Sequence, residues 1–178
     1  MPPVPDDAID PQEDVRAWDA QLVGIVISPG HDYWGRRGEG RMQHGARMPS
    51  EVTAVERMGL EGDRYFGEKP GGRGQVTFLD ADVVDAVRRD FNLPRLPASV
   101  FRRNLIVRDL EGGLAPWLNR QFEFQGVRFE GAQECKPCLW MDRAVAPGVQ
   151  GFLKDGFRGG LRARVLSTGP LRVDGPPV

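Results

Sequence analysis

Apolar and polar residues alternate over short stretches in most of this chain, a pattern typical of β-strands with one buried face. The stretches predict strands at residues 21–28, 51–56, 75–79, 104–107, 121–124, 127–130, 161–166 and 171–173. Gln125 and Gly126 separate two of these strands and indicate a hairpin turn. Residues 167–170 separate the last two strands, which we expect to form another strand pair.

One stretch has the spacing of a helix instead. Asp80 is a favourable N-cap, and apolar residues follow it at helical intervals up to Phe91, so that the helix ends before Pro94. Many short strands, Gly-rich turns and only one or two helices predict a mostly-β fold, either a barrel or a sandwich.

Two segments have no periodicity. Residues 1–19 are rich in Pro and Asp and are expected to form a flexible N-terminal arm, with a turn of helix around residues 14–19. Residues 20–178 are long enough to bury a core as one domain without disulfides. Within this domain, residues 30–49 are rich in Gly and Arg and predict a long functional loop.

Charge and hydropathy exclude several classes of partner. The formal net charge of −1 provides no global field that would attract nucleic acid or an anionic membrane. The first residues have neither a basic start nor an apolar run, so no signal peptide is expected. No stretch approaches the roughly 20 apolar residues of a membrane helix. We therefore expect a soluble, cytoplasmic protein without nucleic-acid or membrane partners.

The only two cysteines, Cys135 and Cys138, lie in one short segment with Lys136 between them and Arg143 soon after. A thiolate is a strong nucleophile and a ligand for soft metals, and neighbouring basic side chains lower the pKa of a thiol. Two interpretations of Cys138 stay open at this point. It is either a solvent-reachable thiolate or a buried small hydrophobe, which is how many free cysteines behave.

Two familiar uses of such a cysteine pair are disfavoured. A thioredoxin-type dithiol requires a helix N-terminus in a βαβ pattern, whereas this segment follows a hairpin strand. A zinc site requires two further ligands, and the two histidines, His31 and His44, lie far away without a finger-like spacing.

Several polar groups could bind an anion. Arg102, Arg103 and Asn104 form a donor-rich step at the start of a strand, and guanidinium groups match phosphate and carboxylate oxygens. The alternative is a solvated basic edge. His44, in the arginine-rich loop, could bind an anion or relay a proton, or it is simply exposed.

Two glycine-rich segments also attract attention. Asp63 and Arg64 follow a turn with two glycines and could form an ion pair. Residues 71–74 (Gly-Gly-Arg-Gly) precede a strand rather than a helix, which favours a flexible turn over a phosphate cradle. Neither a P-loop nor a dinucleotide fingerprint is present.

Taken together and in this order, five segments resemble the MOSC domain, which is found at the C-terminus of molybdenum cofactor sulfurases and as small stand-alone bacterial proteins. The segments are residues 59–66 (GLEGDRYF), 75–79 (QVTFL), 102–107 (RRNLIV), 134–138 (ECKPC) and 159–165 (GGLRARV). The resemblance runs from about residue 21 to residue 174. It implies a closed, strongly bent β-barrel with a few peripheral helices.

The resemblance also implies which residues act. Cys138 matches the key cysteine of the family, which would carry a persulfide in sulfur-delivery members or bind the metal in molybdenum enzymes. Arg103 and Asn104, with Arg102 beside them, would hold the phosphate of molybdopterin. Asp63 and Arg64 would shape the pocket wall, and His44 is a weaker candidate for the same pocket.

Three hypotheses follow from these observations. The first is a molybdenum-cofactor-binding protein with Cys138 as metal ligand and a possible reductase activity on N-hydroxylated compounds, as in some relatives. The second is a sulfur carrier bearing a persulfide on Cys138, with a donor or acceptor protein such as a cysteine desulfurase as partner. The third is an interaction module that keeps the fold without the chemistry. Cys135 would either resolve a persulfide on Cys138 as a disulfide or only pack in the hairpin.

Overall fold

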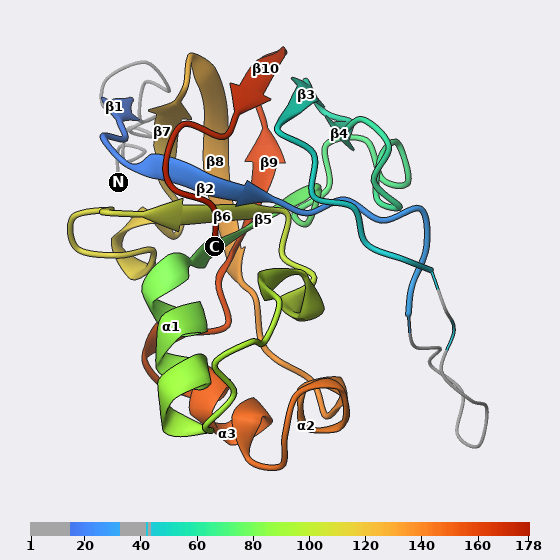
Figure 1. Cartoon of the computed structure of the whole chain (residues 1–178). Coiled ribbons are helices and arrows are strands. Elements are labelled where there is room, and N and C mark those ends of the chain that lie inside the picture. The colour runs from blue at the N-terminus through green and yellow to red at the C-terminus, as the bar shows by residue number, and fades with distance from the viewer. Residues whose placement is uncertain (1–14, 33–41, 43) are drawn as a thin grey trace, which may run out of the picture.

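The computed structural model describes residues 15–32, 42 and 44–178. Within this part of the chain the strands form two sheets, and the larger sheet bends strongly around an apolar interior (Figure 1). In spatial order the larger sheet contains β1 (Arg16–Ala17), β7 (Gln121–Phe124), β8 (Val127–Glu134), β9 (Leu161–Val165), β5 (Val76–Asp80), β6 (Leu105–Arg108) and β2 (Gln21–Ile25).

The smaller sheet has three strands, in the order β10 (Gly169–Arg172), β3 (Glu51–Val55) and β4 (Gly59–Leu60). The predicted mostly-β, strongly bent barrel with few helices is confirmed. The closure differs in one respect, because β1 and β2 stand at the two edges of the larger sheet and are not hydrogen-bonded to each other in the described part of the chain. The barrel is therefore strongly bent but not fully closed.

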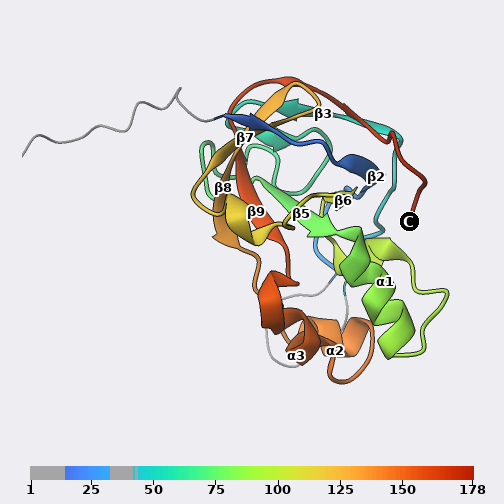
Figure 2. The same cartoon turned by 90° about the vertical axis from the view of Figure 1, so that its left-hand side faces the viewer.

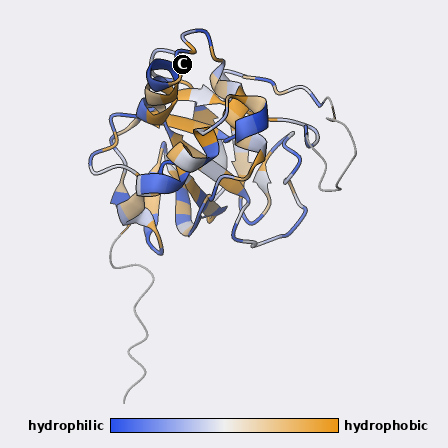
Figure 3. Ribbon diagram, turned by 90° about the horizontal axis from the view of Figure 1, so that it is seen from below, coloured by the Kyte–Doolittle hydropathy of each residue, from blue (hydrophilic) through white to orange (hydrophobic). Residues whose placement is uncertain are grey.

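The inner face of the bent sheet holds an aromatic core, because alternate residues of each strand point to the same face. The ring of Trp18 stacks on Phe122 with centroids 3.9 Å apart, and Phe78 meets Trp18, Phe122 and Phe129 edge-on. Figure 3 shows hydrophobic residues concentrated on the strands, with hydrophilic residues on the surrounding loops. Burial of these rings supplies much of the driving force for folding.

The helices lie together on one side of the sheet (Figure 2) and cover part of its outer face. They are α1 (Ala81–Asp90), α2 (Trp140–Ala144) and α3 (Val149–Lys154). Short 3-10 helices occur at Ala98–Phe101, Ala115–Trp117 and Asp155–Phe157, and Trp117 of the second packs against the inner core. A second apolar cluster joins Val84 and Val87 of α1, Leu153 of α3 and Ile106 of β6. This cluster shields the outer face of the sheet from solvent where the helices pack on it.

Helix α1 is the helix that the apolar spacing predicts. The Asp80 carboxylate accepts a hydrogen bond from the Asp82 amide at 2.9 Å, which confirms Asp80 as N-cap. The short helices α2 and α3 were not predicted, because segments of five and six residues carry too little periodicity to be recognised.

The hairpin at Gln125 and Gly126 is confirmed, since β7 and β8 pair antiparallel on either side of it. The pairing expected between the last two strands is wrong. Strand β9 pairs with β8 and β5, whereas β10 pairs with β3 in the smaller sheet. Both strands form where alternation predicts them, but each finds a partner that is distant in sequence.

Of the predicted N-terminal arm, residues 1–14 lie outside the described residues. In the rest, Arg16–Ala17 forms strand β1, which pairs parallel with β7, and Trp18 is buried in the core. The predicted turn of helix is therefore replaced by strand pairing at these positions. In the described part of the chain, no helix has the length and apolar character needed to cross a membrane.

The free edge of β2 is covered by the last residues of the chain. The Leu22 amide donates to the Asp174 carboxylate at 2.7 Å, and the Asp174 amide donates back to the Leu22 carbonyl at 3.0 Å. The Val178 amide donates to the Val23 carbonyl at 3.2 Å. Residues 174–178, here called the C-terminal strap, thus lie against the strand.

Candidate anion-binding site

A row of polar side chains crosses three strands on the outer face of the larger sheet. Arg162 of β9 is the register partner of Gln133 on β8 and of Thr77 on β5. The neighbouring residues Phe78 and Leu161 are buried in the inner core, so alternation places Thr77 and Arg162 outside. The rigid sheet therefore supplies the floor of a possible site.

This row forms one side of a pocket of about 460 Å³, within the usual range for small-molecule sites. Residues from the segment before β5 form another side. Arg102 and Arg103, which directly follow the 3-10 helix Ala98–Phe101, also line the pocket. The lining residues are Arg64, Tyr65, Glu68, Lys69, Gly72, Arg73, Gly74, Gln75, Thr77, Arg102, Arg103, Gln133, Cys135 and Arg162.

The pocket is strongly basic. Five arginines and one lysine line it, and Glu68 is the single acidic residue in the lining among the described residues. Lys69, Arg73 and Arg162 make no ion pair or side-chain hydrogen bond with any other described residue. Like charges gathered without counter-charges repel each other, so an anion bound among them would relieve that repulsion.

Arg103 connects the pocket to the segment that holds the cysteines. Its Nε donates to the Gly159 carbonyl at 2.9 Å and its Nη1 donates to the Phe101 carbonyl at 2.9 Å. Two protein bonds fix the orientation of the guanidinium plane. Its Nη2 has no protein partner in the described part of the chain and remains available as a donor.

Gly159 is required by a close approach of two backbones. A Cβ at this position would overlap the Cys135 carbonyl oxygen and would lie 3.1 Å from Cδ of Pro137. The cysteine segment therefore packs directly on the residue that Arg103 binds. This contact sets the position of the segment relative to the pocket.

The two cysteines differ in their surroundings. Cys135 is buried, and it lines the pocket. Cys138 is exposed and is not among the lining residues. Of the two interpretations of Cys138 that the sequence leaves open, the structure shows the solvent-reachable one.

Arg102 lines the pocket but is occupied with other contacts. Its Nη2 donates to Ser28 Oγ at 2.7 Å and to the Gly30 carbonyl at 2.6 Å, and its Nη1 lies 3.3 Å from a carboxylate oxygen of Asp32 and 3.4 Å from the His44 carbonyl. Its backbone has φ 53°, in the left-handed region that non-glycine residues rarely adopt. Arg102 therefore ties together the residues on both sides of the arginine-rich loop.

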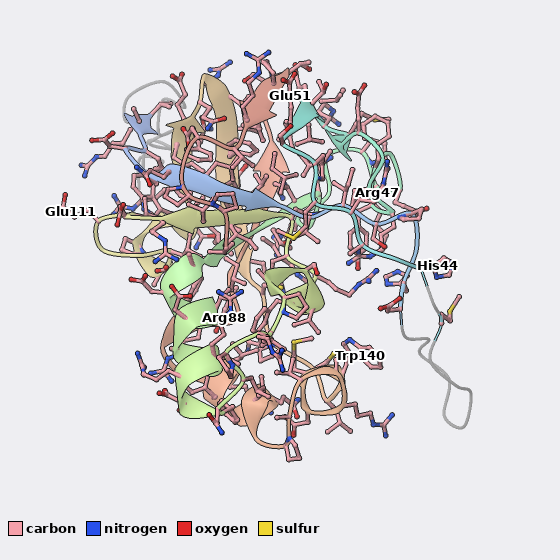
Figure 4. The ribbon with its side chains drawn as sticks, in the orientation of Figure 1. His44, Arg47, Glu51, Arg88, Glu111 and Trp140 are labelled. Atoms are coloured by element: carbon pink, nitrogen blue, oxygen red, sulfur yellow. The ribbon has the colours of Figure 1, made fainter. Side chains whose placement is uncertain are left out.

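His44 does not line the pocket, and its backbone carbonyl accepts a hydrogen bond from Arg102, which does. Figure 4 shows His44 and Arg47 on the loop that extends away from the sheet. The other arginines that the sequence places in this loop, Arg36, Arg37 and Arg41, lie outside the described residues.

Asn104 is buried and lies beneath the pocket instead of lining it. Its Oδ1 accepts from the Thr77 amide at 3.0 Å and from Thr77 Oγ1 at 2.9 Å, and its Nδ2 donates to the Val26 carbonyl at 3.2 Å. These bonds hold β5, β6 and the end of β2 in register. Asn104 is placed to position the pocket floor.

Arg64 lines the pocket, whereas Asp63 is buried beside it and is not among the lining residues. The buried Asp63 carboxylate accepts from the amides of Ser28 and Tyr65 and lies 3.7 Å from Nη1 of Arg64. The Arg64 guanidinium stacks on the Tyr65 ring, 4.6 Å from its centroid. Its buried Nε has no hydrogen-bond partner in the described part of the chain, so this donor is unsatisfied in the protein alone.

The electrostatic environment extends to His31, whose ring meets Tyr65 edge-on. Partial burial, followed by the positive charges of Arg64 and Arg102, lowers the pKa of His31 below its ordinary value. The surroundings therefore favour the neutral imidazole. This is the response expected of a partly buried basic group that lies near positive charge.

Sequence reasoning missed Lys69, Arg73, Gln133 and Arg162. Arg162 could have been found from strand alternation, because Leu161 and Ala163 mark the buried face and leave Arg162 on the other. Arg73 stands in the Gly-Gly-Arg-Gly turn, whose phosphate-binding interpretation was the less favoured one. No group of three or more His, Cys, Asp or Glu side chains forms a metal site in the described part of the chain.

The fold and the pocket together define a small, mostly-β protein with a basic pocket on the outside of a bent sheet. The MOSC domain model matches residues 60–176, a span that includes every residue lining the pocket. The chain belongs to the MOSC domain family. Comparison with curated proteins gives no significant match.

Solved structures share the fold at low identity. YuaD from Bacillus subtilis is 14% identical with a TM-score of 0.64, and the match covers 88% of this chain and 94% of that one. YiiM from Geobacillus stearothermophilus is 16% identical with a TM-score of 0.61, covering 88% and 73%. YiiM from Escherichia coli is 15% identical with a TM-score of 0.57, covering 89% and 67%. The chain spans 61% of the length of a further solved structure with a TM-score of 0.57.

Proposed function

We propose that the pocket binds molybdenum cofactor, a molybdopterin that carries a phosphate. The observation that carries this proposal is the gathering of six cationic side chains around one carboxylate in a pocket of about 460 Å³. Membership of the MOSC domain family, which is associated with this cofactor, supports the same ligand. A guanidinium group can donate two parallel hydrogen bonds to the oxygens of a phosphate. A solvated basic edge, the alternative interpretation, would not need several such groups around one pocket.

The residues present fit such a ligand. Arg103 and Arg162 would hold the phosphate, and the unsatisfied Nε of Arg64 offers a further buried donor. The side-chain amide of Gln133 has no hydrogen-bond partner in the described part of the chain, and it would meet polar atoms of the pterin. When bound, the cofactor supplies a molybdenum centre that can exchange electrons, as a reductase acting on N-hydroxylated compounds would need.

Cys138 is the thiolate that we propose as metal ligand. Its side chain is exposed, Lys136 lies two residues before it, and the segment is held on Gly159 beside Arg103. A soft thiolate is a suitable ligand for molybdenum bound through pterin sulfurs. Cys135, which lines the pocket, is the matched cysteine for comparison.

The test is elemental analysis of protein purified from a host that makes molybdenum cofactor. We expect near-stoichiometric molybdenum in the wild type, loss in Cys138→Ser, and a reduced content in Arg162→Gln. Arg120→Gln is the matched control, because Arg120 is exposed and lies outside the pocket. Wild-type protein without molybdenum or pterin would contradict the proposal, and full occupancy of Cys138→Ser would remove Cys138 from the metal.

A second function, a sulfur carrier, is favoured by the exposure of Cys138. Cys135 is buried and its thiol cannot reach a partner protein, whereas the exposed thiol of Cys138 can. The Cys138 thiolate would attack the outer sulfur of a persulfide on a cysteine desulfurase. The new S–S bond forms on Cys138 as the bond to the desulfurase sulfur breaks, and the desulfurase cysteine leaves as a thiolate.

This alternative has its own measurement. Incubation with a cysteine desulfurase and cysteine should give a persulfide on Cys138 that cyanide releases as thiocyanate, without any metal. Cys138→Ser should lose the signal while Cys135→Ser keeps it. Equal labelling of both single variants would contradict Cys138 as the carrier.

A further inference from the structure

The pocket carries more positive charge than one phosphate requires. We infer that it binds a diphosphate, two linked phosphates, more tightly than the single phosphate that the proposed cofactor carries. This inference rests on the phosphate site proposed above for the same pocket and specifies which phosphate-containing group that site prefers.

The first argument is the charge that the protein leaves unbalanced. Of the six cations in the lining, Arg64 lies beside Asp63 and Arg102 lies beside Asp32. The other four have no carboxylate partner within ion-pair distance in the described part of the chain, and they are Lys69, Arg73, Arg103 and Arg162. Glu68 is the single acid that shares the pocket with them. A phosphate monoester carries about −1.5 to −2 charges at pH 7, so one phosphate leaves an excess that a second would neutralise.

The second argument is the placement of these cations on two different elements. Lys69 and Arg73 belong to the segment before β5, whereas Arg162 stands on β9. The two groups meet at Gly74, where a Cβ would lie 3.6 Å from Cδ of Arg162. Linked phosphates can contact both groups at once, because each phosphate presents its own oxygens to one of them.

The third argument is that the neutral side chains on the β5 side of the pocket are already engaged. Thr77 Oγ1 donates to Asn104 at 2.9 Å, and Gln75 donates to the Arg57 carbonyl while accepting from the Val165 amide at 3.0 Å. Of the side-chain amides in the lining, that of Gln133 is the one without a hydrogen-bond partner in the described part of the chain. The charged side chains therefore outnumber the free neutral donors, which favours a ligand of high charge density.

The experiment is isothermal titration of the purified full chain with inorganic phosphate, inorganic pyrophosphate and ADP at one fixed ionic strength. We expect pyrophosphate to bind about tenfold or more tightly than phosphate, as one additional charge-assisted contact would give. ADP binding as tightly as pyrophosphate would assign a diphosphate ester, and exclusion of ADP would assign the free diphosphate.

Variants locate the second phosphate. Lys69→Gln and Arg73→Gln should each weaken pyrophosphate binding by about tenfold and phosphate binding by much less. Arg120→Gln, a charge-matched control outside the pocket, should leave both affinities unchanged. Circular dichroism of each variant confirms that it is folded.

The outcomes separate this inference from the proposed function. Phosphate and pyrophosphate binding with equal affinity in the pocket would overturn the diphosphate and leave anion binding intact. If neither phosphate nor pyrophosphate binds, both the diphosphate and the proposed phosphate site are overturned. Equal loss of the two affinities in Lys69→Gln and Arg73→Gln would also overturn the diphosphate.

Discussion

The two faces of the strands β5, β8 and β9 have opposite chemistry although they share the same backbone. The inner face carries Phe78, Phe129 and Leu161, all fully buried, whereas the outer face carries Thr77, Gln133 and Arg162 around the pocket. Alternation separates the two sets on β5 and β9, whereas on β8 a register shift between Gly131 and Gln133 brings Gln133 to the outer face. Stability and ligand binding should therefore respond to different substitutions in adjacent positions of one strand.

The largest expected effect lies on the inner face. Phe78→Ala should lower the free energy of unfolding by about 3–5 kcal/mol, because Phe78 is fully buried against four other aromatic rings. Urea unfolding measures this change. Arg162→Gln is the comparison on the outer face and should change stability by only about 0.5 kcal/mol. A cost below about 1 kcal/mol for Phe78→Ala would contradict the tightly packed inner core.

Gly159→Ala tests the point where the cysteine segment meets the pocket. The added methyl group would overlap the Cys135 carbonyl, so we expect a loss of about 1–3 kcal/mol in stability together with weaker phosphate binding. Urea unfolding and phosphate titration measure the two effects. Gly151 in α3 is exposed and has open space around it, so Gly151→Ala should be neutral or stabilising by about 0.5–1 kcal/mol. Unchanged binding in Gly159→Ala would separate the cysteine segment from the pocket.

Asn104 and Arg103 are neighbours with different expected roles. Asn104→Ala should cost about 1–3 kcal/mol in stability, because it leaves buried groups of Thr77 and Val26 without partners, while phosphate affinity changes little per folded molecule. Arg103→Ala should lower phosphate affinity about tenfold and preserve the fold. Denaturant unfolding and phosphate titration on both variants decide the matter. The reverse pattern would make Asn104 the ligand and Arg103 the structural residue.

The smallest expected effect is the pH response of His31. Because its pKa is lowered in the folded protein, the folded state binds fewer protons than the unfolded state below about pH 6.5. The stability that the neutral imidazole contributes is therefore present above that pH and is lost as the pH falls through the folded pKa. Histidine NMR signals followed from pH 8 to pH 5 report this value. Added pyrophosphate should raise it by neutralising nearby arginines, and a fall would contradict an anion beside His31.

Local signals predicted the elements whose formation depends on neighbours in sequence. Asp80 caps α1, and Gln125 and Gly126 form the hairpin turn. These features depend on contacts with residues a few positions away in the sequence, so the sequence alone predicts them. The partners of β10 and the row through Arg162 depend on strands far apart in the chain, which alternation cannot assign.

The candidate site shows the same limit at the level of single side chains. The sequence marks Arg103 and Asn104 as one donor-rich step, but only the fold shows that Thr77 engages the asparagine. It likewise cannot distinguish Cys135 from Cys138, since the burial of one and the exposure of the other depend on tertiary packing. Membership of the family was easier to recognise, because several short motifs occur in the same order.

The C-terminal strap has a consequence for how the protein behaves at high concentration. An uncovered edge strand offers its free amides and carbonyls to the edge of another molecule, which is a common route to aggregation. Here the main-chain groups of Leu22 are engaged by Asp174. At the opposite edge of the sheet, β1 has two residues and so offers few main-chain groups to a strand of another molecule. Asp174 thus leaves fewer free main-chain groups on β2 to which the edge strand of another molecule could bind.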